Sequence, residues 1–201
     1  NFKESAYNLM WNDEFDYTGA PNSSKWHHQT YPPVGSSWFN GELQHYTARI
    51  ENSYVNNGSL KIKAIKESYR DPTSGSTKQY TAARLNSKYA FKYGRVEVRA
   101  KLPAAQGTWP AIWTLGKNIS ENGAYWQTQG YGDTTWPTCG EIDIMEQDSN
   151  KSITSGAFHF PDSNGNHTYT FNYLSVSNTD SSWHVYAMDW SAETIGLSVD
   201  G

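Results

Sequence analysis

Cysteine is almost absent from this sequence, since its 201 residues contain one, Cys139. No disulfide can therefore form within the chain, and a lone cysteine is usually a small, partly buried apolar residue. No apolar run is long enough to span a bilayer, so no membrane partner is expected. Basic residues are also too few for a nucleic-acid partner, because 16 Lys and Arg face 20 Asp and Glu.

The start of the chain lacks the basic and apolar regions of a secretory leader. We nevertheless expect a protein that is secreted or held at the cell surface, with its leader either removed or located before the first residue.

Aromatic residues are plentiful: 9 Trp, 14 Tyr and 7 Phe make up 15% of the chain. Many of the tryptophans lie in segments rich in Gly, Pro, Asn and Thr, which are typical of loops. Tryptophan exposed on loops indicates a flat apolar ligand, such as the face of a sugar ring.

Period-two alternation predicts an all-β fold. In the segment 94–102, apolar residues point one way and charged residues the other, and 59–64, 110–115, 183–190 and 195–199 are further strands. No stretch shows the periodicity of an amphipathic helix over three turns. We predict one domain over residues 1–201, a β-sandwich or barrel, with a long loop over 117–139.

The last predicted strand, 195–199, runs into Asp200 and Gly201, a strong hairpin signal. We expect the domain to continue beyond Gly201. The C-terminal strands would then have been cut away or would be supplied by another polypeptide.

The segment Gly140 to Glu146 contains three acids. In a regular strand Glu141 and Asp143 share one face, whereas Glu146 falls on the other face with the isoleucines. A buried, unpaired carboxylate costs several kcal/mol. We therefore predict a β-bulge near Met145, which returns Glu146 to the acidic face.

Glycoside hydrolysis is a chemistry that requires crowded carboxyl groups. One carboxylate attacks the anomeric carbon, and a protonated carboxyl group donates to the leaving oxygen, so neighbouring charge separates the two roles. Four regular strand steps place the Cα atoms of Glu141 and Glu146 about 13 Å apart. Side chains that lean together to about 5 to 6 Å favour retention of configuration. A solvated acidic strand or a calcium site is the alternative interpretation.

At this strand the chain resembles glycoside hydrolase family 16, whose signature is Glu-x-Asp-x-x-Glu with the bulge. Further segments resemble the family's laminarinase branch, in the family's order: 11–15, 40–46, 83–87, 93–97, 107–113 and 136–141. The resemblance implies a jelly-roll β-sandwich of two curved antiparallel sheets, like that of concanavalin. It also implies Glu141 as nucleophile, Glu146 as general acid/base and Asp143 as their helper.

The resemblance further implies a set of substrate-binding residues: Trp136, Trp109, Trp113, Asn40, Glu42, Arg84 and His159. Trp136, on the non-reducing side of the cut, and the other two tryptophans would stack on sugar rings. The polar residues would hold glucose hydroxyls, with His159 near the scissile bond.

Simpler structural roles remain open for several of these residues. Trp113 could pack in the core, Arg84 could form a surface salt bridge, and His159 could be a hydrogen-bonded structural histidine. His159 lies two residues after Ala157, so both side chains project from the same face of a strand, which favours the cleft face for His159.

The resemblance implies no cofactor for catalysis. It does imply a structural calcium ion, with Glu14 and the carbonyl of Gly58 as ligands.

The expected partner is a β-1,3-glucan, which a monomer of the protein would bind. The alternatives are a family member acting on mixed-linkage glucan, agar or carrageenan, and a non-catalytic glycan-binding sandwich. The unshortened acid spacing favours β-1,3-glucan over mixed-linkage glucan, and the scarcity of basic residues argues against sulfated galactans.

Overall fold

A computed structural model describes residues 7–201. Residue contacts divide the chain into two compact units. One unit contains Phe91–Gly116 and Thr135–Gly201, together with the described residues 7 and 8. The other contains Leu9–Ala90 and Lys117–Thr134.

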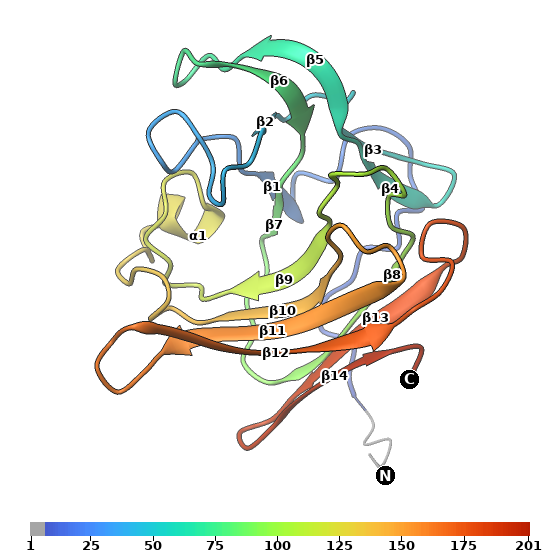
Figure 1. Ribbon diagram of the computed structural model, residues 1–201, viewed down its shortest axis with the longest axis vertical. Helices are drawn as coiled ribbons and strands as arrows, with labels where there is room; N and C mark the ends of the chain where they lie inside the picture. The colour runs from blue at the N-terminus through green and yellow to red at the C-terminus, as the bar shows by residue number, and fades with distance from the viewer. Residues whose placement is uncertain (1–6) are drawn as a thin grey trace. The chain divides into compact units, whose positions relative to one another are not determined.

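The first unit is a sandwich of two antiparallel sheets (Figure 1). The first sheet has the order β12-β11-β10-β9, and the second has the order β14-β13-β8. Their bounds are β8 Gly94–Ala100, β9 Ala111–Leu115, β10 Glu141–Glu146, β11 Ile153–Pro161, β12 His167–Ser175, β13 His184–Trp190 and β14 Ile195–Val199.

Apolar side chains between these two sheets form the core of the unit. Tyr186 and Met188 of β13 are fully buried, and they cluster with Ile144 and Met145 of β10 and with Leu102. The predicted alternation of the segment after Gly94 is confirmed, since successive residues of β8 are alternately half-buried and exposed. One face of the β9–β12 sheet is thereby committed to the core, and the opposite face is left for other uses.

The predicted bulge is present in β10. Against β9 the register shifts by one residue between Asp143 and Met145, and against β11 it shifts between Asp143 and Glu146. The successive residues Ile144 and Met145 are both buried in the core, which a regular strand does not permit. The extra residue returns Glu146 to the face that carries Asp143.

The second unit contains three small sheets, β1-β7, β2-β6-β5 and β3-β4. Their strands are β1 Trp26–His28, β2 Gln44–Tyr46, β3 Ser53–Asn56, β4 Ser59–Ile62, β5 Ile65–Arg70, β6 Thr77–Ala82 and β7 Leu85–Ser87. The pairing of β2 with β6 is parallel, whereas the resemblance implied antiparallel sheets. A parallel pair requires a long connection, which β3, β4 and β5 provide here.

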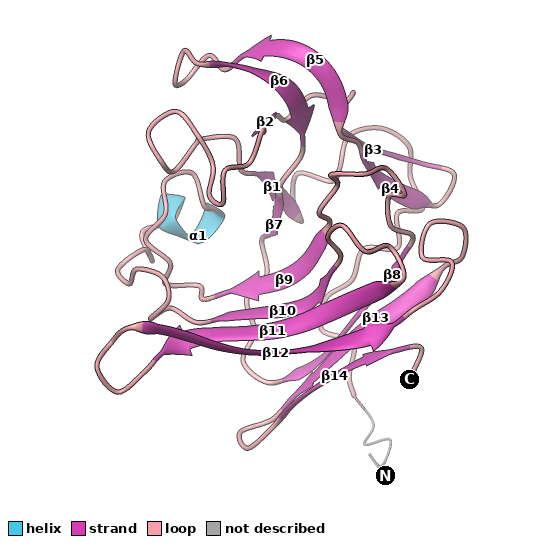
Figure 2. Cartoon of the chain, viewed as in Figure 1, coloured by secondary structure: helices cyan, strands magenta, loops and turns pink. Residues whose placement is uncertain are grey.

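The segment predicted as a long loop contains one helical turn, α1 (Tyr125–Thr128), coloured cyan in Figure 2. A single turn produces too short a pattern to be recognised from periodicity. Among residues 7–201, no helix has the length and apolar character needed to cross a membrane.

Truncation of Met145 tests the packing at the bulge. Its side chain is 1% exposed, so Met145→Ala should lower the free energy of unfolding by about 2–5 kcal/mol, measured by urea denaturation. Leu174→Ala is the control, because Leu174 is 48% exposed in the same unit and should change stability by roughly 0.5 kcal/mol or less. Equal losses in both variants would contradict the assigned core.

Candidate active site

The three acids of β10 lie on the face of the sheet opposite the core. Their partners on β11 are His159 opposite Glu141, Ala157 opposite Asp143 and Ser155 opposite Glu146. Directly paired residues project from the same face of a sheet. The acids and His159 therefore share one surface, as the strand pattern predicted.

Each glutamate accepts a hydrogen bond from an indole. Trp136 Nε1 donates to Glu141 Oε2 over 2.7 Å, and Trp109 Nε1 donates to Glu146 Oε1 over 2.9 Å. The family resemblance implied that both tryptophans are stacking platforms, and their hydrogen bonds to the acids were not predicted. With Trp136 43% exposed and Trp109 53% exposed, ring surface also remains available to a ligand.

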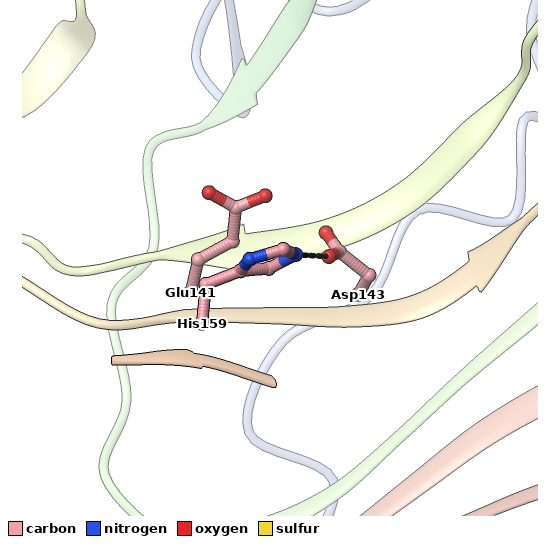
Figure 3. A group of neighbouring side chains, drawn as sticks. All are labelled: Glu141, Asp143 and His159. Atoms are coloured by element: carbon pink, nitrogen blue, oxygen red, sulfur yellow. Dashed lines mark ion pairs between the residues drawn. The ribbon is translucent and has the colours of Figure 1, made fainter. Parts of the chain in front are cut away.

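Asp143 lies between the glutamates and is 3% exposed. Figure 3 shows Glu141, Asp143 and His159 standing on the same side of the sheet. His159 Nε2 lies 3.1 Å from Asp143 Oδ2, although the two atoms are not aligned for a hydrogen bond. The buried Oδ2 thus has no hydrogen-bond partner among the described residues. A buried carboxyl group of this kind favours its neutral, protonated form.

Burial and neighbouring charge separate the acids electrostatically. Burial raises the pKa of Asp143, and the charge of Glu141, the charge of Glu146 and a hydrogen bond with Glu141 raise it further. Burial also raises the pKa of Glu146, an effect that the Trp109 hydrogen bond opposes. Both groups consequently hold a proton to a higher pH than an exposed carboxyl group.

Two histidines extend this surface beyond the acids. His159 Nδ1 and His167 Nε2 lie 2.9 Å apart and share a hydrogen bond, and the His167 ring lies 4.4 Å from that of Trp136. Burial and the charge of His167 lower the pKa of His159, outweighing the charge of Glu141. The lowered pKa favours the neutral form of His159. His159 lies on the acid-bearing face and is also hydrogen-bonded to His167. The geometry is thus compatible with a cleft histidine and with a hydrogen-bonded structural histidine.

Trp113 pairs with Asp143 across β9 and β10, whereas its neighbour Ile112 packs against the core. Trp113 therefore projects from the acid-bearing face, and the core-packing alternative does not describe it.

Asn40, Glu42 and Arg84 belong to the second unit. Arg84 forms an ion pair with Glu121 over 3.0 Å, and both side chains are largely buried, so the surface salt bridge considered above is a buried one. Burial raises the pKa of Glu42, an effect opposed by a hydrogen bond from Gln44 and by the charge of Arg84. Asn40 is exposed, with a left-handed backbone at φ 57°. These residues provide hydrogen-bonding groups within their own unit.

The residues expected to hold calcium, Glu14 and Gly58, belong to the second unit and supply fewer oxygens than the roughly six to eight that calcium takes. Glu14 is exposed and accepts a hydrogen bond from Asn12 over 3.3 Å. Beside Gly58, the ammonium of Lys61 donates to the carbonyl oxygens of Asn56 and Ser59. A fixed positive charge at this turn opposes a second cation there. Glu14 and Gly58 by themselves therefore do not fit the ion.

Within residues 7–201, the side chains best grouped to ligate a metal are Glu141, Asp143 and His159, whose donor atoms lie within 4.8 Å of one another. Ligands of a tetrahedral zinc ion lie about 3.4 Å apart, given bonds of ~2.1 Å. A metal ion would therefore require these donor atoms to move closer together. Acid–base chemistry can use the three groups at their present spacing.

Sequence reasoning missed the contribution of β12. Its residues alternate between aromatic rings and Thr or Asn side chains from His167 to Tyr173. Tyr169 pairs with His159, and Phe171 pairs with Ala157, so the rings stand on the acid-bearing face. This period-two alternation was visible in the sequence and could have identified the strand.

A two-sheet sandwich that presents a pair of glutamates beside tryptophans defines a glycan-hydrolysing class of site. The family model "Glycosyl hydrolases family 16" matches residues 40–201. The chain belongs to this family, which confirms the resemblance drawn from the motifs.

Named relatives agree with this assignment. A "Beta-glucanase" from Rhodothermus marinus is 40% identical over 98% of the chain, and a "Glucan endo-1,3-beta-glucosidase A1" from Niallia circulans is 36% identical over 98%. The crystal structure of a LamA variant from Zobellia galactanivorans with laminaritriose and laminaritetraose matches 96% of this chain and 77% of its own. Its TM-score is 0.91 at 52% identity, which confirms the jelly-roll fold. The chain spans 64% of the Rhodothermus relative and 29% of the Niallia relative.

The raised pKa of Asp143 gives a testable dependence of stability on pH. Above the ordinary pKa of 3.8, Asp143 stays protonated in the folded state, whereas it loses its proton in the unfolded chain. The contribution of Asp143 to stability is therefore full below pH 3.8 and declines as pH rises. Asp143→Asn should remove the decline. Relative to the parent, the variant should gain free energy of unfolding as pH rises from 4 to 7, by at most about 1.4 kcal/mol per pH unit in urea titrations.

Asp162→Asn is the control of opposite sign. Asp162 accepts hydrogen bonds from the backbone N–H groups of Asn164 and Asn166, which lower its pKa. Its contribution is present above the unfolded pKa and lost in acid, so this variant should lose stability relative to the parent as pH rises. Parallel pH profiles for Asp143→Asn and the parent would show that Asp143 does not hold the proton.

Proposed function

We propose that this protein is an endo-1,3-β-glucanase that cleaves internal bonds of laminarin-type β-glucans with retention of configuration. The observation that carries this proposal is the bulge in β10, which puts Glu141 and Glu146 on one face with Asp143 between them. The names of the Rhodothermus, Niallia and Zobellia relatives support a β-glucan substrate.

In the first step the carboxylate of Glu141 attacks the anomeric carbon. The glycosidic bond breaks, and Glu146 gives its proton to the leaving oxygen. The raised pKa of Glu146 supports this role, because it keeps the carboxyl group protonated closer to neutral pH. The indole of Trp136 holds the Glu141 carboxylate by a hydrogen bond to Oε2.

In the second step Glu146, now ionised, removes a proton from water, which attacks the same carbon and releases Glu141. The neutral carboxyl group of Asp143 shares its proton with Glu141 and limits repulsion between the acids. This mechanism requires no cofactor, because two carboxyl groups serve as nucleophile, acid and base.

We assign glycan binding to Trp109, Trp113, Trp136 and His159 on the acid-bearing face, and glucose hydroxyl recognition to Asn40, Glu42 and Arg84. We further propose a monomer that is secreted or held at the cell surface, where polysaccharide substrates occur. A structural calcium at Glu14 and Gly58 stays a prediction from the resemblance, requires further ligands, and supports no catalytic step.

Removal of the proposed nucleophile tests the reaction. The parent should release reducing ends from soluble β-1,3-glucan faster than from mixed-linkage glucan, agarose or carrageenan. Glu141→Ser should lower that rate by more than about 1,000-fold, which is about 4 kcal/mol of transition-state stabilisation. Glu193→Ser, in an exposed turn, is the control and should keep full activity. NMR of the first product should show the β-anomer. Glucan binding by the folded parent without any release would favour the non-catalytic sandwich.

Removal of the indole N–H at Glu146 tests the proton donor. The Trp109 hydrogen bond stabilises the Glu146 carboxylate and lowers its pKa, so Trp109→Phe should raise that pKa. The alkaline limb of the kcat/KM profile should then move to higher pH, by up to about one unit. Trp183→Phe, at an exposed tryptophan of the same unit, should leave the limb in place. An unmoved limb for Trp109→Phe would assign the limb to another group.

A further inference from the structure

The acid-bearing face carries exposed rings that the proposed mechanism does not use. Tyr169, Phe171 and Tyr173 of β12, here called the β12 aromatic row, are 55%, 49% and 59% exposed. Thr and Asn alternate with them along the strand. Exposed apolar surface of this extent indicates a ligand.

Small side chains separate the row from the catalytic strand. Ser155 of β11 pairs with Glu146 on one side and with Tyr173 on the other, and Ala157 likewise lies between Asp143 and Phe171. Two strand spacings put β10 and β12 about 9.6 Å apart. Tall rings on one side, acids on the other and small residues between them make a groove along β11.

A cavity of about 250 Å³ occupies this groove. It is lined by the β12 aromatic row, by Ser155, Ala157 and His159 of β11, and by Glu146 and Trp109, together with Asp148 and Ile153. Neither Glu141 nor Trp136 contributes to its lining. The proposed proton donor therefore lines the cavity itself, whereas the proposed nucleophile lies beyond its His159 end.

The position of the cavity relative to Glu146 and Glu141 determines which part of the glycan the cavity would hold. A general acid contacts the oxygen of the departing sugar, whereas the nucleophile contacts the ring that stays. We propose that the β12 aromatic row binds the glucosyl units on the leaving-group, reducing-end side of the scissile bond. This inference rests on the proposed function and specifies where half of the substrate lies.

The arrangement of the rings fits a wall beside a sugar chain. Tyr169 and Phe171 stack with centroids 5.8 Å apart and planes 23° apart, so each supports the other. Tyr173 is turned by 72° from Phe171 and presents a different surface at the end of the row. Rings provide apolar contact for the C–H faces of glucose, and tyrosine hydroxyls can bond its hydroxyl groups.

The same subsite would receive an incoming sugar after the first step. The ester between the glycosyl unit and Glu141 is attacked either by water or by a sugar hydroxyl, and Glu146 takes the proton in both cases. A sugar held by the β12 aromatic row therefore competes with water, so the row should promote transglycosylation.

The test compares two substrates that differ on the leaving side. Laminarihexaose needs sugar subsites there, whereas para-nitrophenyl β-laminaritrioside places nitrophenol at the first one. The double variant Phe171→Ala, Tyr173→Ala should lower kcat/KM for laminarihexaose roughly tenfold, which equals about 1.4 kcal/mol. Release of nitrophenol should be unchanged, and the yield of transglycosylation products should fall.

Leu174→Ala is the matched control, because Leu174 is an exposed apolar residue of the same strand on the opposite face. If the double variant folds poorly by circular dichroism, Phe171→Leu with Tyr173→Leu keeps apolar bulk without the rings and should show the same selective loss. An equal loss on both substrates, or no loss on either, overturns the proposal. No loss together with a changed oligomeric state would identify the row as a contact between chains instead. A parent that cleaves neither substrate overturns the proposed function itself.

Discussion

The single extra residue in β10 is the constraint on which the candidate site depends. The strand must supply apolar side chains to the core and acids to the opposite face, and strict alternation cannot do both from Glu141 to Glu146. Without the bulge, Glu146 would enter the cluster around Tyr186 and Met188, where an unpaired carboxylate costs several kcal/mol. Burial of both Ile144 and Met145 stabilises the bulged geometry. Core packing and catalytic geometry are therefore set by the same backbone irregularity.

Three acids on one face repel one another, and the surrounding residues distribute that cost unequally. Asp143 is buried and its Oδ2 has no aligned donor among the described residues, so the carboxyl group favours a proton. The two glutamates are less buried, and each accepts a hydrogen bond from an indole. At Glu146 that bond lowers the pKa, against the effect of burial. The three carboxyl groups therefore differ in electrostatic environment despite lying on one short strand. Such differences are what assign acid and nucleophile roles within a crowded site.

Sequence patterns predicted the features that depend on alternation. The strands β8, β9, β10, β13 and β14, the bulge and the placement of His159 on the acid-bearing face all follow from which residues must face the core. The two indole hydrogen bonds could not be predicted in this way, because periodicity assigns a face and does not assign a rotamer or a partner. The parallel pairing of β2 with β6 depends on contacts remote in sequence. The aromatic alternation on β12 was available in the sequence, but its relation to Glu146 depends on strand order.

Trp109 connects the proposed sugar subsite with the proposed proton donor. Its indole donates to the carboxyl group of Glu146, and its ring lines the cavity that also contains the β12 aromatic row. A sugar in that cavity would contact the ring whose N–H influences the acidity of Glu146, the proposed proton donor. Any shift of the ring away from Glu146 weakens a bond that favours the carboxylate, and so strengthens the hold of Glu146 on its proton. If the cavity is the leaving-group subsite and Glu146 is the acid, then occupation of the subsite and protonation of the leaving oxygen depend on the same side chain.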